Sequence, residues 1–186
     1  MEGTPGKLFH YSSAGLQIIA AILENISGKD FNTLFEERIA RPCNMINTDF
    51  GQAKVPLAAG SGLSTAKDYL NFLAMLLNNG NFNGVQVLSK QAVIEMQKNR
   101  LSKDVYIAYT PAETEGWGYA YGEWTMDDSI GHKRSGLVSS PGLFGSFPWI
   151  DNTNHYAGFL LTLNIQYRGR RQKYEDLMKR VVAAIQ

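Results

Sequence analysis

The sequence predicts an α+β fold, with a mainly helical part over residues 1–100 and antiparallel strands plus a packing helix over residues 101–186. Up to about residue 100, apolar residues recur at the spacing of amphipathic helices. Beyond that point, aromatic residues alternate with glycine and other small residues, which is typical of strands. A chain of 186 residues with 44% hydrophobic residues can build one substantial core, so we expect a single domain.

Two helices with clear end signals are predicted first. Ser12 or Ser13 can cap the first helix, and Gly28 can end it. Apolar residues cover so much of this helix that we expect it to be buried on most sides. Asp30 is a cap for the second helix, which should end before Pro42.

A third helix and a hairpin complete the helical part. Ser64 or Thr65 can cap the third helix, and Asp68 lies in its first turn, where the helix dipole favours an acidic side chain. The pair Asn83-Gly84 predicts a tight hairpin turn. Ser89 is a cap for a further short helix.

The second part is predicted to contain strands and one last helix. Trp117–Gly122 alternates between aromatic and small residues, as a strand with one buried face does. Two further strands are expected at about residues 142–151 and 155–165, joined by the turn Asn152–Asn154. Residues 172–185 have the apolar spacing of a helix that packs on the sheet.

Composition and residue spacing argue against several classes of function. The net charge is +1 without a long run of one sign, so we expect no nucleic acid or anionic membrane partner. No apolar run reaches the ~20 residues that span a bilayer, and the first residues do not resemble a signal peptide. The single cysteine, Cys43, cannot form an intrachain disulfide and is predicted to be a buried apolar residue. Because His10, His132 and His155 lack metal-site spacing, we expect no metal and no cofactor.

One literal match to a catalytic motif is present. Ser64-Thr65-Ala66-Lys67 has Ser-x-x-Lys spacing, which can place a lysine amine beside a nucleophilic serine on one face of a helix. The same residues also fit a helix start, in which Ser64 or Thr65 is the cap and Lys67 lies in the first turn. We favour the helix start and retain the Ser64/Lys67 pair as the alternative.

An ordered set of short segments resembles one known family. Tyr11–Ser13 is similar to a Tyr-x-Asn segment, and Ala59–Asp68 is similar to a Gly-Gly-Leu-x-Ser-Thr-x-x-Asp segment that opens a helix. Gly116–Tyr119 and Pro141–Asp151 continue the similarity in the same order. Together these segments resemble the class C β-lactamase and penicillin-binding serine hydrolase family. The resemblance implies a β-lactamase/transpeptidase-like fold, incomplete here.

The resemblance also implies roles for five residues. Tyr11 matches the tyrosine that serves as general base toward the serine. Ser13 stands where the family has an asparagine that recognises a substrate carbonyl, and Ser140 stands where it has the cation of a Lys/His-Thr/Ser-Gly triplet. Gly142 would let a substrate lie close to the strand edge, and the backbone N–H of Leu143 would be one oxyanion-hole donor.

In the family the nucleophilic Ser-x-x-Lys segment precedes the tyrosine segment by a long stretch, whereas Tyr11 lies near the start of this chain. The resemblance therefore implies a C-terminal portion of a serine hydrolase that acts by acyl transfer on ester, amide or peptide substrates. We expect the nucleophile and the first sheet strands to lie upstream, and the chain alone to be inactive. Because Ser13 and Ser140 replace the usual amide and cation, esterase or peptidase-like chemistry is favoured over β-lactam hydrolysis.

A second hypothesis is a non-catalytic binding or assembly domain that keeps the fold without the chemistry. A chain that lacks strands of its sheet would expose a strand edge and apolar surface. Such a chain is expected to pair with a second copy of itself or with the missing N-terminal part. Its location in the cell is left open by the sequence, although intact members of the family are often exported.

Overall fold

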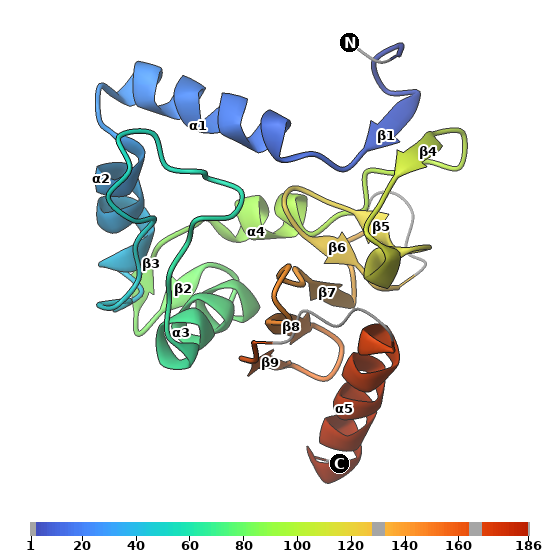
Figure 1. The fold of residues 1–186 in the computed structure, drawn as a ribbon. Helices are drawn as coiled ribbons and strands as arrows, with labels where there is room; N and C mark the ends of the chain where they lie inside the picture. The colour runs from blue at the N-terminus through green and yellow to red at the C-terminus, as the bar shows by residue number, and fades with distance from the viewer. Residues whose placement is uncertain (1–2, 128–132, 164–168, 186) are drawn as a thin grey trace. The chain divides into compact units, whose positions relative to one another are not determined.

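The computed structural model describes residues 3–127, 133–163 and 169–185 (Figure 1). The chain forms two compact units, and each is described by itself below. The helical unit comprises Tyr11–Lys90, and the strand unit comprises Met1–His10 with Gln91–Gln186. Helices are followed by an antiparallel sheet and a C-terminal helix, so the predicted α+β class is confirmed.

The helical unit consists of helices joined by irregular segments and a small hairpin. Its elements are α1 (Ser13–Ser27), α2 (Phe31–Phe35), the π-helical turn η1 (Glu36–Ala40), α3 (Ala66–Leu77), β2 (Asn81–Phe82) and β3 (Val85–Gln86). The hairpin turn between β2 and β3 is confirmed, since both of its central residues, Asn83 and Gly84, have positive φ angles.

The helix ends are formed by the residues predicted to cap them. The Ser12 hydroxyl accepts the N–H of Ala14, and Gly28 ends α1 in the left-handed conformation. Asp30 caps α2, and Thr65 rather than Ser64 caps α3. Each cap satisfies a backbone N–H or C=O that the helix itself leaves unpaired.

Buried polar and aromatic contacts tie the irregular segment between η1 and α3 to the helices. The Asp68 carboxylate is buried and accepts the N–H of Asn47 at 2.6 Å and the Thr48 hydroxyl at 3.0 Å. Phe50 packs edge-on against Phe31 and Phe35, with ring centroids 4.9 and 5.0 Å apart. The irregular segment is therefore held by α2 and α3.

We expected helix α1 to be buried on most sides, and this prediction was wrong. Ala20 is its one buried residue, and five large apolar side chains of α1 are exposed. Helical periodicity identifies apolar positions but does not identify what covers them.

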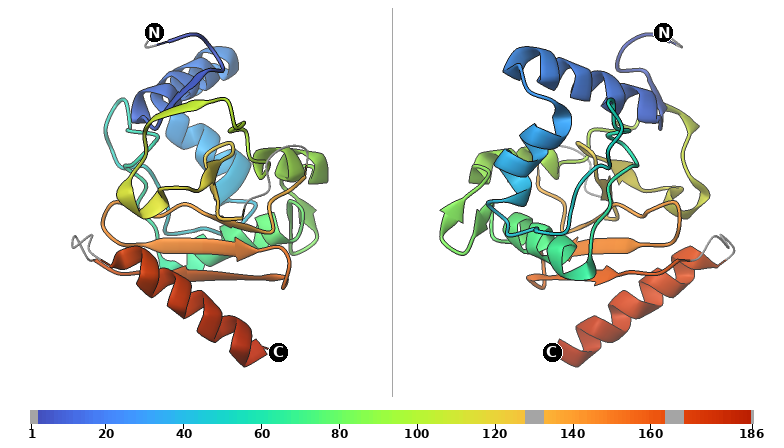
Figure 2. Two further views of the ribbon diagram at one scale, coloured as in Figure 1. Left: turned by 90° about the vertical axis from the view of Figure 1, so that its right-hand side faces the viewer. Right: turned by 60° about the vertical axis from the view of Figure 1, so that its left-hand side comes forward.

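Among its described residues, the strand unit contains two sheets and three helices, the first of which begins at the unit boundary. A parallel pair joins β1 (Leu8–His10) to β4 (Tyr106–Tyr109). A five-stranded antiparallel sheet has the order β5 (Gly118–Tyr119), β6 (Trp124–Thr125), β7 (Leu137–Ser139), β8 (Phe147–Asp151) and β9 (Tyr156–Leu160). The helices are α4 (Lys90–Met96), the short 3₁₀ helix η2 (Ala112–Thr114) and α5 (Arg170–Ile185), which lies against β8 and β9 (Figure 2).

The core of the strand unit lies where α5 packs on the buried strand β8. The rings of Phe147 and Tyr174 stack with centroids 4.0 Å apart, and the Tyr174 hydroxyl donates to the Gly145 carbonyl. The Trp149 ring covers Gly158 on β9, leaving no space for a Cβ atom there. Aromatic stacking thus fixes the helix on the sheet.

The strand boundaries differ from the predictions in three places. The strand expected at residues 142–151 begins at Phe147, because Gly142 and Ser146 close a turn and Gly145 has a φ of 100°. The alternation around Trp117–Gly122 forms β5 and then a turn at Gly122, rather than one strand. Strand β9 ends at Leu160, and residues 164–165 of the expected strand lie outside the described residues, as does His132.

The burial of the single cysteine and the character of the helices bear on two further predictions. Cys43 is fully buried, as predicted, and burial raises the pKa of its thiol to about 11, so the thiol stays protonated at neutral pH. Of the helices in the described ranges, none combines the length and the apolar character needed to cross a bilayer.

Candidate active site

Tyr11 and Ser13 flank the cap residue at the start of α1. Tyr11 is half-buried and directly precedes Ser12, whose hydroxyl accepts the N–H of Ala14 at 3.2 Å. Ser13 is the first residue of the helix and is exposed. The cap therefore fixes the backbone between the two predicted site residues.

Ser140, Gly142 and Leu143 lie on the turn that joins β7 to β8. The N–H of Gly142 donates to the carbonyl of Ser146 at 2.8 Å. A Cβ atom on Gly142 would lie 2.1 Å from the Ser146 hydroxyl oxygen, so a larger residue at this position would require the Ser146 side chain to move. Leu143 is 62% exposed, and its N–H makes no hydrogen bond within the part of the chain that the structure describes.

A buried arginine anchors this turn to the last helix. The guanidinium of Arg170, at the start of α5, donates to the Leu143 carbonyl through both terminal nitrogens at 3.3 Å. It also lies 3.4 Å from the Glu113 carboxylate and is almost fully buried. A charge-assisted contact of this kind, shielded from water, holds the turn in one conformation.

The structure thus gathers the predicted residues into two groups. Tyr11 and Ser13 belong to the helical unit, whereas Ser140, Gly142 and Leu143 share one turn of the strand unit. The roles proposed for them stay predictions.

The geometry around Ser64 favours a helix start over a catalytic pair. Helix α3 begins at Ala66, so Ser64 lies outside the helix and does not share a helical face with Lys67. The Ser64 hydroxyl is hydrogen-bonded to the Thr48 hydroxyl at 2.8 Å, and the Lys67 side chain is exposed. Among the described residues, the Ser64 hydroxyl contacts the Thr48 hydroxyl and the Thr65 carbonyl rather than a lysine amine.

The sequence reasoning missed a second triplet of cation, hydroxyl and glycine. Arg134, Ser135 and Gly136 directly precede β7. The buried Ser135 hydroxyl donates to one Asp127 carboxylate oxygen at 2.6 Å, and the Gly136 N–H donates to the other at 2.5 Å. This triplet matches the Lys/His-Thr/Ser-Gly pattern better than Ser140-Pro141-Gly142 does, and a scan for any cation at the first position would have found it.

A buried acid lies beside the same triplet. The Arg134 Nε donates to the Gln97 side-chain oxygen at 2.6 Å, and both Gln97 and Arg134 lie close enough to the Glu123 carboxyl group to influence its pKa. Burial raises the pKa of Glu123 to about 7, although Gln97 and the charge of Arg134 act in the opposite direction. The protonation of Glu123 is therefore expected to change near neutral pH.

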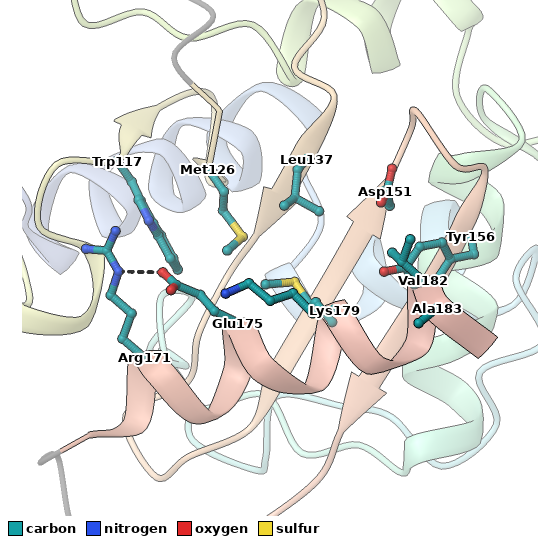
Figure 3. Close-up of a pocket in the computed structure, with 11 residues that line it drawn as sticks. Trp117, Met126, Leu137, Asp151, Tyr156, Arg171, Glu175, Lys179, Val182 and Ala183 are labelled. Atoms are coloured by element: carbon teal, nitrogen blue, oxygen red, sulfur yellow. Dashed lines mark hydrogen bonds and ion pairs between the residues drawn. The ribbon is translucent and has the colours of Figure 1, made fainter. Parts of the chain in front are cut away.

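A pocket of about 470 Å³ lies between α5 and the sheet (Figure 3). Arg171 forms one end, where its guanidinium pairs with Glu175 at 2.8 Å and lies 5.2 Å from the centre of the Trp117 ring. Asp151 and Tyr156 line the other end. None of the five predicted site residues lines this pocket, which is therefore distinct from the β7–β8 turn.

Within the described ranges, no group of three or more His, Cys, Asp or Glu side chains could hold a metal ion. The chemistry available at the described site residues is that of hydroxyl, phenol and backbone N–H groups.

The sequence matches the model of a protein family described as Beta-lactamase over residues 1–183. The chain therefore belongs to the β-lactamase family of serine hydrolases and has the β-lactamase/transpeptidase-like fold. The resemblance noted from the sequence is confirmed.

Individual relatives agree with this assignment. Protein Rv1367c of Mycobacterium tuberculosis (strain ATCC 25618 / H37Rv) is 29% identical over 180 residues, covering 78% of this chain and 44% of the relative. The crystal structure of a candidate β-lactamase from Bacteroides dorei DSM 17855 is 29% identical with a TM-score of 0.73, and covers 84% of this chain and 50% of that one. EstCE1, a hydrolase with promiscuous acyltransferase activity, has a TM-score of 0.74 at 17% identity, covering 94% of this chain and 57% of that one.

The chain spans about half the length of the relatives it matches.

Proposed function

We propose that this chain is the C-terminal portion of a β-lactamase-like serine hydrolase that transfers acyl groups from ester or amide substrates. The observation that carries the proposal is the family match over residues 1–183 in a chain about half as long as its relatives. EstCE1, a hydrolase with promiscuous acyltransferase activity, shares the fold, which supports acyl transfer as the type of reaction.

In this proposal the nucleophile lies in the portion of the domain that this chain does not contain. The environment of Ser64 supports it, because its hydroxyl is hydrogen-bonded to the Thr48 hydroxyl and the residue lies before the first residue of α3. Tyr11 is proposed as the general base that takes the serine proton and later protonates the leaving group.

The β7–β8 turn is proposed to bind the substrate. The backbone N–H of Leu143, an exposed residue, would donate to the developing oxyanion, while Ser140 and Ser13 would contact the substrate through their hydroxyl groups. The turn is held by Arg170 before substrate arrives, and a preorganised donor stabilises a transition state better than a mobile one.

The first test compares the chain alone with a chimera. The chimera joins this chain to the portion of the Bacteroides dorei protein that the match leaves uncovered, which we expect to carry a Ser-x-x-Lys segment. With nitrocefin and p-nitrophenyl acetate as substrates, the chain alone should show background hydrolysis, and the chimera should hydrolyse the acetate ester.

Replacing Tyr11 by Phe removes the phenol and keeps the ring. In the chimera, Tyr11→Phe should lower kcat/KM by about 10²–10⁴-fold, the usual contribution of a general base. Tyr109→Phe, at an exposed tyrosine of β4, is the matched control and should leave the rate unchanged. If the chain alone hydrolyses the ester and Ser64→Ala abolishes this activity, the proposal is refuted and the Ser64/Lys67 alternative is restored.

A second candidate function is a non-catalytic assembly domain with the same fold. The exposed apolar side chains of α1 favour it, since they mark a surface for another polypeptide. An inactive chimera whose two portions nevertheless fold together would support this function over the hydrolase.

A further inference from the structure

Helix α1 contacts the rest of the helical unit along one narrow face. The Gln17 side chain donates to the Pro56 carbonyl at 3.0 Å and accepts the N–H of Ala58 at 3.1 Å. Ala20 is buried, and the Glu24 carboxylate accepts the N–H of Phe31 at 2.8 Å. Positions 17, 20 and 24 are spaced by three and four residues, so these three side chains share one face of the helix.

The outward face of α1, opposite these contacts, is apolar along its length. It consists of Ile18, Ile19, Ile22, Leu23 and Ile26, which are 62%, 53%, 50%, 47% and 80% exposed. The five positions form two rows with a spacing of four residues, one of three side chains and one of two.

This arrangement reverses the usual pattern of a surface helix, whose outward face is polar. Glu24 is the one charged residue of α1, and its carboxylate is bonded on the inward face. No charged side chain therefore interrupts the exposed apolar face of this helix. A contiguous apolar patch of this kind marks an interaction surface.

We propose that the outward face of α1 is the docking surface for the remaining portion of the β-lactamase domain, and that a helix of that portion packs on it. The partner is inferred from length, because half of the Bacteroides dorei chain lies outside the matched region. Rows with four-residue spacing form ridges that fit the grooves of another helix, so the partner element is helical and apolar. The inference rests on the proposed function, because it takes the chain to be one portion of a larger β-lactamase-like domain.

The test is association between two separate polypeptides. The full chain is co-expressed with the tagged portion of the Bacteroides dorei protein that the match leaves uncovered, and the complex is measured by co-purification and light scattering. We expect a one-to-one complex. A charge introduced into the outward face, Ile22→Asp, should weaken it at least about 100-fold, as expected for a buried unpaired charge at an interface.

The matched control is Val85→Asp, at a side chain of the same unit that is 51% exposed, against 50% for Ile22. This control should leave the complex intact. Both variants should shift the Tm of the chain alone by no more than about 2 °C, because neither position is buried. A fall of more than about 5 °C in Ile22→Asp alone would mean that the chain already covers this face, and would overturn the proposal.

Other outcomes are equally decisive. If the chain alone forms a dimer that Ile22→Asp dissociates, the face binds a second copy and the proposal is overturned. The proposal is also overturned if no complex forms, or if Ile22→Asp leaves the complex intact. Because the readout is binding, it is independent of hydrolysis. A complex that forms through α1 but stays inert would retain the docking surface and contradict the proposed function.

Discussion

At the residue scale, close packing makes one glycine indispensable and leaves another replaceable. A Cβ atom on Gly158 would lie 2.1 Å from the Trp149 ring, whereas one on Gly15 would meet no atom within 4 Å. We expect Gly158→Ala to lower the free energy of unfolding by about 2–3 kcal/mol through overpacking. The control Gly15→Ala should raise it by about 0.5–1 kcal/mol, since alanine is the better helix former. Urea denaturation measures both, and equal effects would contradict the packing described for β8 and β9.

The buried carboxyl group of Glu123 predicts a dependence of stability on pH. Its pKa is about 7 in the folded chain, against 4.5 as the ordinary value. Between these two values the unfolded chain has lost the proton that the folded chain retains, so rising pH favours unfolding. From pH 4.5 to 7, this group should lower the free energy of unfolding by up to about 3 kcal/mol.

The variant Glu123→Gln isolates this contribution. It keeps the shape of the side chain and cannot ionise, so the free energy of unfolding of the variant should fall less steeply than that of the unmodified chain over this interval. Chemical denaturation at several pH values provides the comparison. Parallel pH profiles of the two proteins would show that Glu123 ionises normally.

At the scale of the element, the start of α3 depends on one hydroxyl. The Thr65 side chain accepts the N–H of Asp68, which the helix cannot pair itself. Thr65→Ala should therefore cost about 1 kcal/mol of unfolding free energy, whereas Thr65→Ser should keep the cap and cost less than about 0.5 kcal/mol. Denaturant midpoints of the two variants would be compared. Equal midpoints would mean that Thr65 does not cap the helix.

Elements whose ends depend on local chemistry were predictable from the sequence. Gly28, Asp30 and Thr65 act within one turn of their own positions, and Asn83-Gly84 forms its hairpin through the φ angles of two residues. The start of β8 was not predictable in this way. Gly142 fits a strand entry by composition, but its hydrogen bond to Ser146 closes a turn, and the turn is held by a residue far along the chain.

At the scale of the whole molecule, the family was identified from the order of several short motifs along the chain, because no single motif was specific enough. The fold class and the family were therefore predictable. The exposure of α1 was not, because an apolar pattern is the same whether its cover belongs to this chain or to another. For the candidate site, the resemblance supplied Tyr11 and the β7–β8 turn, and their roles stay predictions. The Arg134–Gly136 triplet that precedes β7 was missed because its cation is an arginine.

The contact of Arg170 with the β7–β8 turn has a consequence for how shortened members of this family are recognised. A gene that stops before α5 would still encode the short segments that carry the resemblance to the family, including Ser140–Leu143. Its product would nevertheless lack the buried guanidinium that holds the Leu143 carbonyl and the tyrosine that bonds Gly145. An intact motif in a genome is thus no guarantee of an intact site, and a reading frame should be checked for its last helix before an enzyme is inferred from it.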